Sequence, residues 1–148
     1  MKFIVKLFPE IIIKSKPVRK KFTQQLRDNL RKLLLPLDPG LIIVRDWDRI
    51  TIETHATDLD VLEGFATVLC NTPGIAHVIE VGGGLNQHVE SAGVDLHNPD
   101  VTVRIEVRNE TVYIVNRRLE GLGGYPLGTV DAVMSLISGG FDSTVSSY

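Results

Sequence analysis

One apolar stripe constrains the fold of the first half of the chain more than any other feature. It consists of Val18, Phe22, Leu26, Leu30 and Leu33. The spacing of three or four residues predicts an amphipathic helix that ends near Leu35, before two prolines. Pro17 suits the first position of that helix.

Short strand patterns surround this helix. Strands are expected at 2–8, with a continuation at 11–13 after Pro9, and at 41–45, 49–54 and 75–81. Asp46-Trp47-Asp48 joins the second and third of them as a tight hairpin. A second helix, capped by Thr57 or Asp58, is expected over 59–69. The order β-α-β-β-α-β predicts a ferredoxin-like domain over residues 1–81.

The pattern changes after residue 81. Residues 85–92 have mixed helical character, and 101–107 with 111–115 predict a β-hairpin. Residues 121–128 contain four glycines and a proline, so they are expected to form a linker. Residues 132–137 are expected to be a strand of the kind that is buried in a parallel sheet.

Charge is distributed unevenly along the chain. Residues 1–35 contain ten Lys or Arg and two acids, whereas the remaining 113 residues contain six basic and 16 acidic side chains. A basic first quarter in a chain of net charge −2 is typical of a protein that presents one face to a polyanion. Taken alone, a run of charges is more often an ordinary solvated helix surface.

Several classes of site and location are disfavoured. The apolar runs are too short to span a bilayer and no secretory signal is present at the start, so the chain is expected to be cytoplasmic. The single cysteine, Cys70, excludes an intramolecular disulfide and is expected to be a half-buried packing thiol rather than a nucleophile. The four histidines lack close ligand spacing, so no metal site is expected.

The last residues carry the motif with chemical meaning. Ser138-Gly139-Gly140-Phe141-Asp142-Ser143 follows the expected strand, and residues 144–148 are expected to begin a helix. Glycine amides and a helix N-terminus bind phosphate oxygens, serine hydroxyls donate to them, and Asp142 would orient the loop or approach Mg²⁺. The lysine of a Walker A loop is absent. The motif predicts nucleotide binding, and the alternative is a surface turn rich in small residues.

This motif resembles the PP-loop of enzymes that adenylate a substrate and release pyrophosphate. Together with "FIVKLFPEIIIKSK", "PGIAHVIEV", "GGGLNQHVESAGVDLHNPDVTVRIEV" and "EGLGGYPLGTVDAVMSLISGGFDS", it makes nearly all of the chain similar to the N-terminal part of the tRNA 4-thiouridine synthetase (tRNA sulfurtransferase) family. The resemblance implies an α+β chain in three parts: a ferredoxin-like domain at 1–81, a THUMP RNA-binding domain at 82–127 without its first part, and the start of an α/β PP-loop domain at 128–148.

The resemblance also implies a reaction and its partners. The family activates uridine 8 of tRNA with ATP and Mg²⁺, and persulfide sulfur from a cysteine desulfurase then replaces the oxygen; sulfur is also supplied for thiamine thiazole synthesis. The family's sulfur-carrying cysteines lie beyond the PP-loop and Cys70 matches none of them, so the chain alone is expected to be inactive and no catalytic residue is assigned. A homodimer is possible. The residues implied to contact ATP are Ser138, Gly139, Gly140, Asp142 and Ser143.

With this family in view, the basic segment gains weight as a tRNA-binding surface. Lys16, Lys20, Arg27 and Arg31 are expected near one helical face opposite the apolar stripe, with Arg19 and Lys21 flanking them. Arg117 and Arg118 follow the hairpin and can bind phosphates in a bidentate manner. Tyr125 is open to two interpretations, stacking on an unpaired base or packing within the linker.

The chain departs from the family pattern in two places. The family has several tens of residues between the equivalents of Val81 and Gly82, and this sequence stops five residues after Ser143. A helix that short is unstable alone, so the phosphate loop is expected to be unformed. Two other functions are considered: an RNA-binding adaptor with a vestigial PP-loop, and a PP-loop enzyme that acts on a small molecule, against which the basic helix argues.

Overall fold

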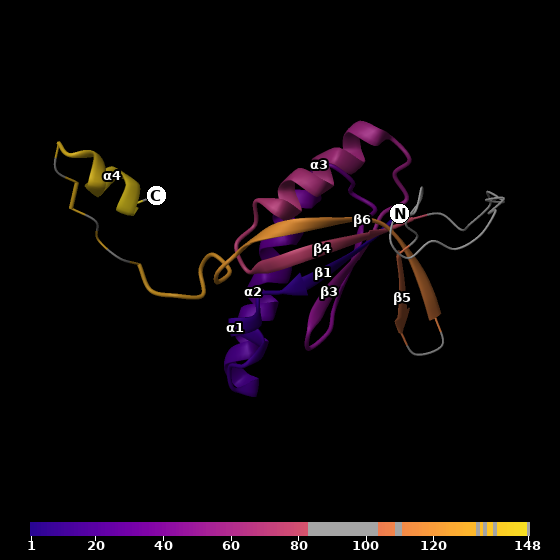
Figure 1. Ribbon diagram of the computed structural model, residues 1–148, viewed down its shortest axis with the longest axis horizontal. Coiled ribbons are helices and arrows are strands. Elements are labelled where there is room, and N and C mark those ends of the chain that lie inside the picture. The colour runs from indigo at the N-terminus through magenta and orange to yellow at the C-terminus, as the bar shows by residue number, and fades with distance from the viewer. Residues whose placement is uncertain (83–103, 109–110, 133, 135, 138, 148) are drawn as a thin grey trace, which may run out of the picture.

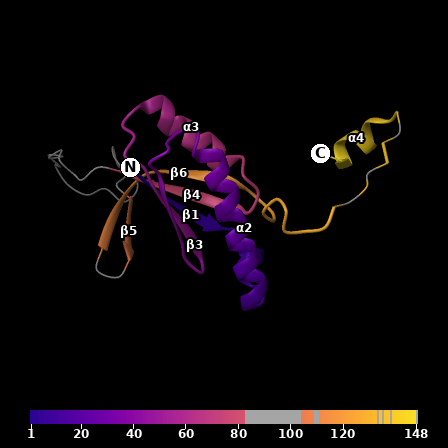
Figure 2. The same cartoon turned by 180° about the vertical axis from the view of Figure 1, so that it is seen from behind.

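The computed structural model describes residues 1–82, 104–108, 111–132, 134, 136–137 and 139–147. Within them, six antiparallel strands form one sheet in the order β2-β3-β1-β4-β6-β5, and α2 and α3 cover one of its faces (Figures 1 and 2). The elements are β1 Lys2–Leu7, α1 Pro9–Ile12, α2 Lys16–Leu34, β2 Ile42–Arg45, β3 Arg49–Glu53, α3 Leu59–Cys70, β4 Ile75–Val81, β5 Arg104–Arg108, β6 Thr111–Gly123 and α4 Phe141–Ser147. The order predicted for residues 1–81 is confirmed, with α1 as an addition.

Helix α2 buries a stripe that differs from the predicted one at its ends. Phe22, Leu26 and Leu30 are buried as expected, and the stripe continues to Leu34. Val18 and Leu33 are instead 38% and 50% exposed. Steps of four residues rotate slowly around a helix, so a stripe that follows them reaches Leu34 rather than Leu33.

The strand expected at 11–13 is wrong, because residues 9–12 form the short helix α1. The Phe8 N–H donates to the Gly74 oxygen at 3.0 Å, which ends the strand pairing, and Pro9 then starts a helical turn. Ile11 is fully buried by this turn, whereas Ile13 is 79% exposed.

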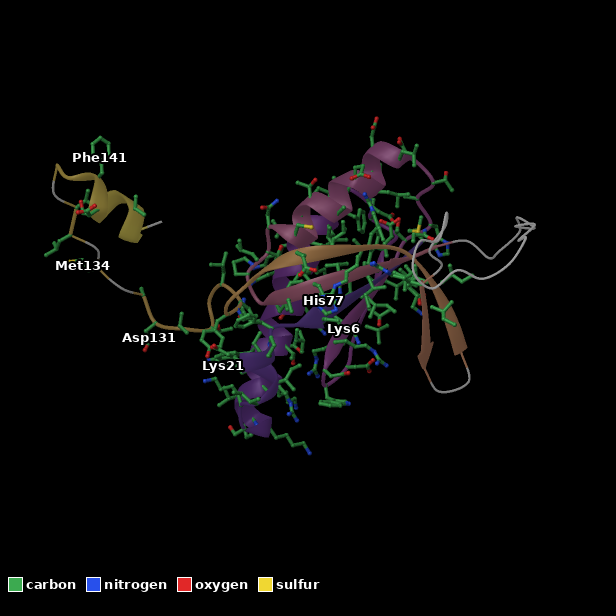
Figure 3. All side chains as sticks on the ribbon, in the orientation of Figure 1. Lys6, Lys21, His77, Asp131, Met134 and Phe141 are labelled. Carbon is green, nitrogen blue, oxygen red and sulfur yellow. The ribbon has the colours of Figure 1, made fainter. Side chains whose placement is uncertain are left out.

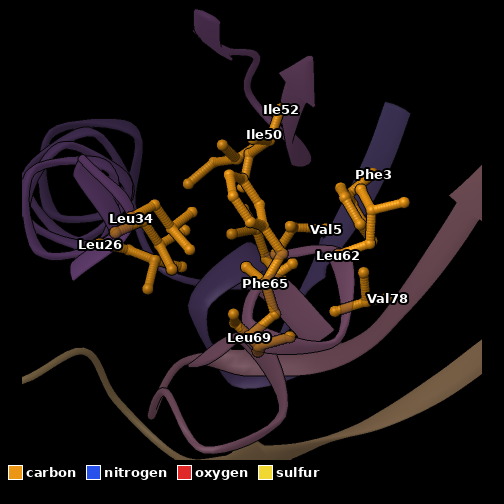
Figure 4. Packing of buried hydrophobic residues seen from close by; sticks show 13 residues of the cluster. Phe3, Val5, Leu26, Leu34, Ile50, Ile52, Leu62, Phe65, Leu69 and Val78 are labelled. Atoms are coloured by element: carbon orange, nitrogen blue, oxygen red, sulfur yellow. The ribbon is translucent and has the colours of Figure 1, made fainter. Parts of the chain in front are cut away.

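The core lies between the sheet and the two long helices (Figure 4). Phe3 of β1 stacks on Phe65 of α3 with ring centroids 5.7 Å apart, and both side chains are fully buried. Helix α3 begins at the predicted cap, where the Asp58 carboxylate accepts from the Asp60 N–H at 3.0 Å. The first 81 residues therefore hold a complete hydrophobic core, to which the remainder of the chain is attached.

Strand β6 crosses the segment that was expected to be a linker. It runs to Gly123 and pairs with β4 from Val115 to Gly123, so the linker prediction is wrong for residues 121–123. A Cβ at Gly121 would lie 2.3 Å from the Ile75 oxygen, so only glycine allows the two strands to approach here. The glycine signal marks close backbone approach rather than a chain break. The first residues of β6, 111–115, pair with β5 as the predicted hairpin.

The buried strand expected at 132–137 is also wrong. Met134 and Leu136 are 89% and 85% exposed, and no described strand pairs with this segment. Strands of a parallel sheet need neighbours on both sides and cover on both faces, none of which the described residues supply. Helix α4 lies apart from the sheet at the end of this segment (Figure 1). The helix expected at 85–92 and residues 101–103 of the expected strand lie outside the described residues.

Candidate nucleic-acid interface

A seam between α2 and the edge strand β2 brings most of the predicted tRNA-binding cations together. The two elements run in opposite directions, which three contacts establish. Arg45 Nη1 donates to Thr23 Oγ1 at 3.0 Å, and the Arg19 guanidinium carbon lies 5.5 Å from the centroid of the Trp47 ring. At the other end, an open hollow of about 250 Å³ is lined by Arg27, Arg31, Leu41, Ile42 and Ile43.

The cations lie beside the apolar stripe rather than opposite it, which corrects the sequence analysis. Two buried residues, Thr23 and Leu34, continue the same row along the helix, at steps of three or four residues, as Lys16, Lys20, Arg27 and Arg31. At 100° per residue, this row borders the buried face on the side of β2. The face turned away from the sheet instead carries Lys21 and Lys32, both exposed, and Figure 3 labels Lys21 on this helix.

The cations of the seam differ in how far the fold already uses them. Arg27 pairs with Asp28 at 2.6 Å, and hydrogen bonding from Arg27 lowers the pKa of that carboxyl. Arg19 Nη1 donates to the Ile12 oxygen at 3.0 Å. The exposed Lys16, Lys20 and Arg31 make no ion pair with another described residue. These three charges are therefore available to an external anion.

The two predicted arginines of β6 have different surroundings. Arg117 Nε donates to Glu80 of β4, its register partner, and Arg117 Nη1 lies 2.7 Å from Glu63 of α3. Hydrogen bonding to Glu80, the larger cause, and to Glu63 raises the pKa of Arg117. Arg118 is more open: its side chain is 50% exposed and pairs with Glu120 at 3.2 Å. Arg117 thus joins β6 to both β4 and α3, whereas the half-exposed Arg118 pairs with Glu120 of its own strand.

Tyr125 packs in the structure, although on α2 rather than within a linker. Its ring meets Phe22 edge to face with centroids 5.4 Å apart. Its hydroxyl donates to the Glu10 carboxylate at 2.9 Å, and Lys14 Nζ lies 5.4 Å from its ring centroid. The following segment is held to the same helix, because Asn29 donates to the Leu127 oxygen at 2.9 Å.

The residues of the phosphate-loop motif are exposed at the start of α4. Gly139 and Gly140 precede the helix, and a Cβ at Gly139 would have no atom within 4 Å. Ser143 Oγ donates to the Gly140 oxygen at 2.9 Å, and Asp142 lies in the first helical turn. Ser138 lies outside the described residues. Glycine N–H groups and a carboxylate are group types that bind phosphate and Mg²⁺, whereas the Ser143 hydroxyl would have to leave the Gly140 oxygen to donate to a phosphate, so the ATP and Mg²⁺ contacts stay a prediction. Phe141 and Met134 mark this part of the chain, apart from the sheet (Figure 3).

Cys70 has the environment of a packing thiol. It is half-buried at the end of α3, and burial raises the pKa of its thiol. A raised pKa keeps the sulfur protonated near neutral pH, which makes it a poor nucleophile. Among the described residues, no three His, Cys, Asp or Glu side chains gather closely enough to hold a metal ion, and no described helix is long and apolar enough to cross a membrane.

Sequence reasoning missed three members of the seam, namely Thr23, Arg45 and Trp47. The sequence pattern predicts only a turn at Trp47 and the end of a strand at Arg45. The available signal was a large aromatic residue in a turn otherwise made of aspartates, where no core requires it. What placed these residues beside α2 is the packing of the β2–β3 hairpin, which no spacing within one element reveals.

Two protein-family models match this chain. The model described as the ThiI ferredoxin-like domain matches residues 2–78, which are 77 of the 148 residues, and the THUMP domain model matches residues 78–116. The chain belongs to the ThiI ferredoxin-like domain family. The family resemblance and the α+β class predicted from the sequence are confirmed, whereas the domain boundaries at 81/82 and 127/128 stay predictions.

Curated relatives of this family member are named tRNA sulfurtransferase. Those of Shewanella woodyi and Shewanella pealeana are 42% and 41% identical to it over 197 aligned positions, which include all of this chain and 41% of each relative. The chain spans about two fifths of the length of these relatives. Since it has 148 residues, the other 49 of the 197 positions have no residue here. That difference has the size of the segment that the resemblance implies between Val81 and Gly82.

Two solved structures share the fold. The crystal structure of a 4-thiouridine synthetase–RNA complex with bound ATP matches with a TM-score of 0.65 and 24% identity, over 99% of this chain and 48% of that one. PH1313 from Pyrococcus horikoshii matches with a TM-score of 0.58 and 18% identity, over 87% of this chain and 58% of that one. At these identities the likeness concerns the fold alone.

Proposed function

We propose that the chain is the tRNA-recruiting part of an ATP-dependent tRNA sulfurtransferase that acts in the cytoplasm. One observation carries this proposal: Lys16, Lys20 and Arg31 line one seam with no internal partner among the described residues, in a chain that matches both the ThiI ferredoxin-like and THUMP models. Each additional cation that contacts a phosphate backbone strengthens binding and makes the affinity fall more steeply with salt. Arg118 is a further cation on β6, half exposed and paired with Glu120, at a distance from the seam.

The reaction proposed for the whole protein begins with activation of uridine 8 in tRNA. The uridine carbonyl oxygen attacks the α-phosphorus of ATP and pyrophosphate leaves. The terminal sulfur of a persulfide, supplied by a cysteine desulfurase, then adds to the activated carbon and AMP departs with the oxygen, which leaves the new sulfur joined to the carrier cysteine by an S–S bond. A second cysteine thiol attacks the carrier sulfur and forms a disulfide with it, so the S–S bond breaks and the new sulfur stays on the uridine. Ser138, Gly139, Gly140, Asp142 and Ser143 would contact the ATP phosphates, with Asp142 orienting the loop or approaching Mg²⁺. Supply of sulfur for thiamine thiazole synthesis and a homodimeric state belong to the same proposal.

Cys70 does not take part in this chemistry. Its half-buried, protonated thiol is unsuited to carry a persulfide, so the sulfur-bearing cysteine lies elsewhere in the system. The second candidate function, an RNA-binding adaptor with a vestigial loop, shares the tRNA surface and differs only in ATP use. ATP–pyrophosphate exchange, measured with a longer form of the protein that continues past Tyr148 and with tRNA added, separates the two. Exchange that requires tRNA supports the enzyme.

Filter binding of unmodified tRNA to the chain tests recruitment. We expect saturable binding that Arg118→Ala weakens for all tRNAs without changing the preference among them, because phosphate contacts carry no sequence information. Arg117→Ala is expected to do the same, but it also disturbs the contact with Glu80, so its thermal unfolding must be measured alongside. Failure of the unaltered, folded chain to bind any tRNA would overturn the proposal.

A further inference from the structure

We propose that Trp47 is a stacking platform for an unpaired nucleobase of RNA, with the neighbouring backbone phosphates bound by Lys16 and Lys20. This inference rests on the proposed tRNA recruitment and adds to it a place where single-stranded RNA is distinguished from a duplex. A base in a duplex is already stacked on its neighbours, so only an unpaired base has a face to offer to an aromatic ring.

The first argument is the exposure and support of the ring. Trp47 occupies the tip of the β2–β3 hairpin and is 63% exposed, although the Arg19 guanidinium lies 5.5 Å from its centroid. Arg19 is itself held in place by the Ile12 oxygen at 3.0 Å. A large ring with a fixed cation against it and most of its surface in water has no role in the core. Such a ring offers a π-face to any base, whatever its identity.

The second argument is that the hairpin is fixed and its acids are partly neutralised. Asp46 and Asp48 flank the ring and would repel phosphates. Arg49 lies 3.1 Å from the Asp46 carboxylate and 3.9 Å from that of Asp48. The Asp46 N–H also donates to the Arg49 oxygen at 2.9 Å, which closes the turn. The platform is therefore organised before the ligand arrives, which reduces the entropy cost of binding.

The third argument is the charge next to the ring. Lys16 and Lys20 lie three residues before and one residue after Arg19 on the same helix, and both are exposed without an ion-pair partner in the described ranges. The row continues to Arg31, a distance of about 22 Å along the helix axis at 1.5 Å per residue. A single strand that stacks on Trp47 can thus follow the seam to the hollow beside Arg27 and Arg31.

The inference can be tested directly because Trp47 is the single tryptophan of the chain, so its fluorescence reports on this ring alone. The chain is titrated with a single-stranded oligoribonucleotide, with a blunt duplex of the same sequence, and with polyphosphate and an acidic peptide as anions without bases. We expect the single strand to quench Trp47 and the other three to leave it nearly unchanged at equal occupancy. Equal quenching by polyphosphate or the peptide, or binding of the single strand without quenching, would overturn the inference.

Matched variants test the same point by affinity, measured by anisotropy of labelled RNA. Trp47→Ala should weaken single-strand binding by about tenfold or more, while Trp47→Phe, which keeps a ring, retains most of it. Lys16→Ala with Lys20→Ala should weaken it more than Lys21→Ala with Lys32→Ala, which removes the same charge from the outer face of α2. Far-UV circular dichroism confirms that each variant is folded.

The two levels of proposal fail in different ways. If the unaltered chain binds no tRNA, the recruitment function is lost and this subsite with it. If tRNA binds, but Trp47 fluorescence does not respond and Trp47→Ala binds as tightly as the unaltered chain, the subsite is wrong and recruitment stands.

Discussion

Arg117 lies between two carboxylates that belong to different elements, Glu80 on β4 and Glu63 on α3. Glu80 is 7% exposed, whereas the Glu63 side chain is 64% exposed. The sequence marked Arg117 as a cation for tRNA, and the structure gives it an internal task as well. Whether it also contacts tRNA stays a prediction.

Removing only Arg117 from the Arg117–Glu80 pair should lower the stability of the fold more than removing both residues. Arg117→Leu leaves a buried, unpaired carboxylate and is expected to lower the free energy of unfolding by about 2 kcal/mol. Adding Glu80→Leu should recover most of the loss, because two apolar side chains of similar shape can replace a buried pair. Urea unfolding of the single and double variants measures this. A double variant no more stable than Arg117→Leu would contradict the assignment.

Asp38 makes the stability of the fold depend on pH in the acidic range. Its carboxylate accepts from Thr54 Oγ1 at 2.5 Å and from the Gly40 N–H at 2.8 Å, and these bonds, the first above all, lower its pKa. The charged form is favoured in the folded state, so its contribution is complete above the ordinary pKa of about 4 and is lost as pH falls through the lower folded value.

We therefore expect Asp38→Asn to lower the urea midpoint at pH 6, with the difference from the unaltered chain shrinking as the pH falls below about 4. Asp131→Asn, which alters an exposed carboxylate in the C-terminal segment, is the control. A difference that stays constant from pH 6 to pH 3 would show that the hydrogen bonds of Asp38 do not depend on its charge.

At the scale of elements, the glycines of β6 carry information that the sequence alone misassigned. Gly121→Ala should destabilise the chain by about 1–3 kcal/mol, because its Cβ would meet the Ile75 oxygen of β4 at 2.3 Å. Gly64→Ala is the matched control: it lies within α3, where a Cβ would only touch Leu37 at 3.4 Å, and alanine favours a helix. The thermal unfolding midpoint should fall for Gly121→Ala and rise for Gly64→Ala. A stable Gly121→Ala chain would mean that the strands can separate without cost.

Hydrophobic patterns within single segments were sufficient to predict the helices and strands of the first 81 residues, apart from α1. Alternation and three-to-four spacing gave β1, α2, α3 and β4, because each buries one face against the same core. The patterns failed where the outcome depends on another segment. Residues 132–137 look like a buried strand but have no described neighbour, and β6 continues through glycines because β4 lies beside it. The seam was predicted only in part for the same reason: the sequence indicated the cations of α2, but not the residues of the β2–β3 hairpin that pack beside them.

At the scale of the whole molecule, the charge asymmetry and the fold agree. The first 35 residues, with ten basic and two acidic side chains, include α2, whose row of cations lies along the seam. If about five of these cations contact phosphates, log affinity for tRNA should fall with log salt with a slope near −4. Filter binding across a salt series measures it. A flat profile would remove the electrostatic basis of recruitment.

Strand β6 pairs with β5 through its first residues and with β4 through its last ones, and the β4–β6 register shifts between Glu80 and Val81 and again between Ile75 and His77. Successive side chains of a strand point to opposite faces, so one residue inserted near Val115 that no further bulge absorbs would turn the later side chains over. Arg117 would then leave the helix side of the sheet and Gly121 would no longer meet Ile75. Added length is therefore tolerated in this strand only where a bulge absorbs it, and natural variation in length should be concentrated in its connections and at these two register shifts.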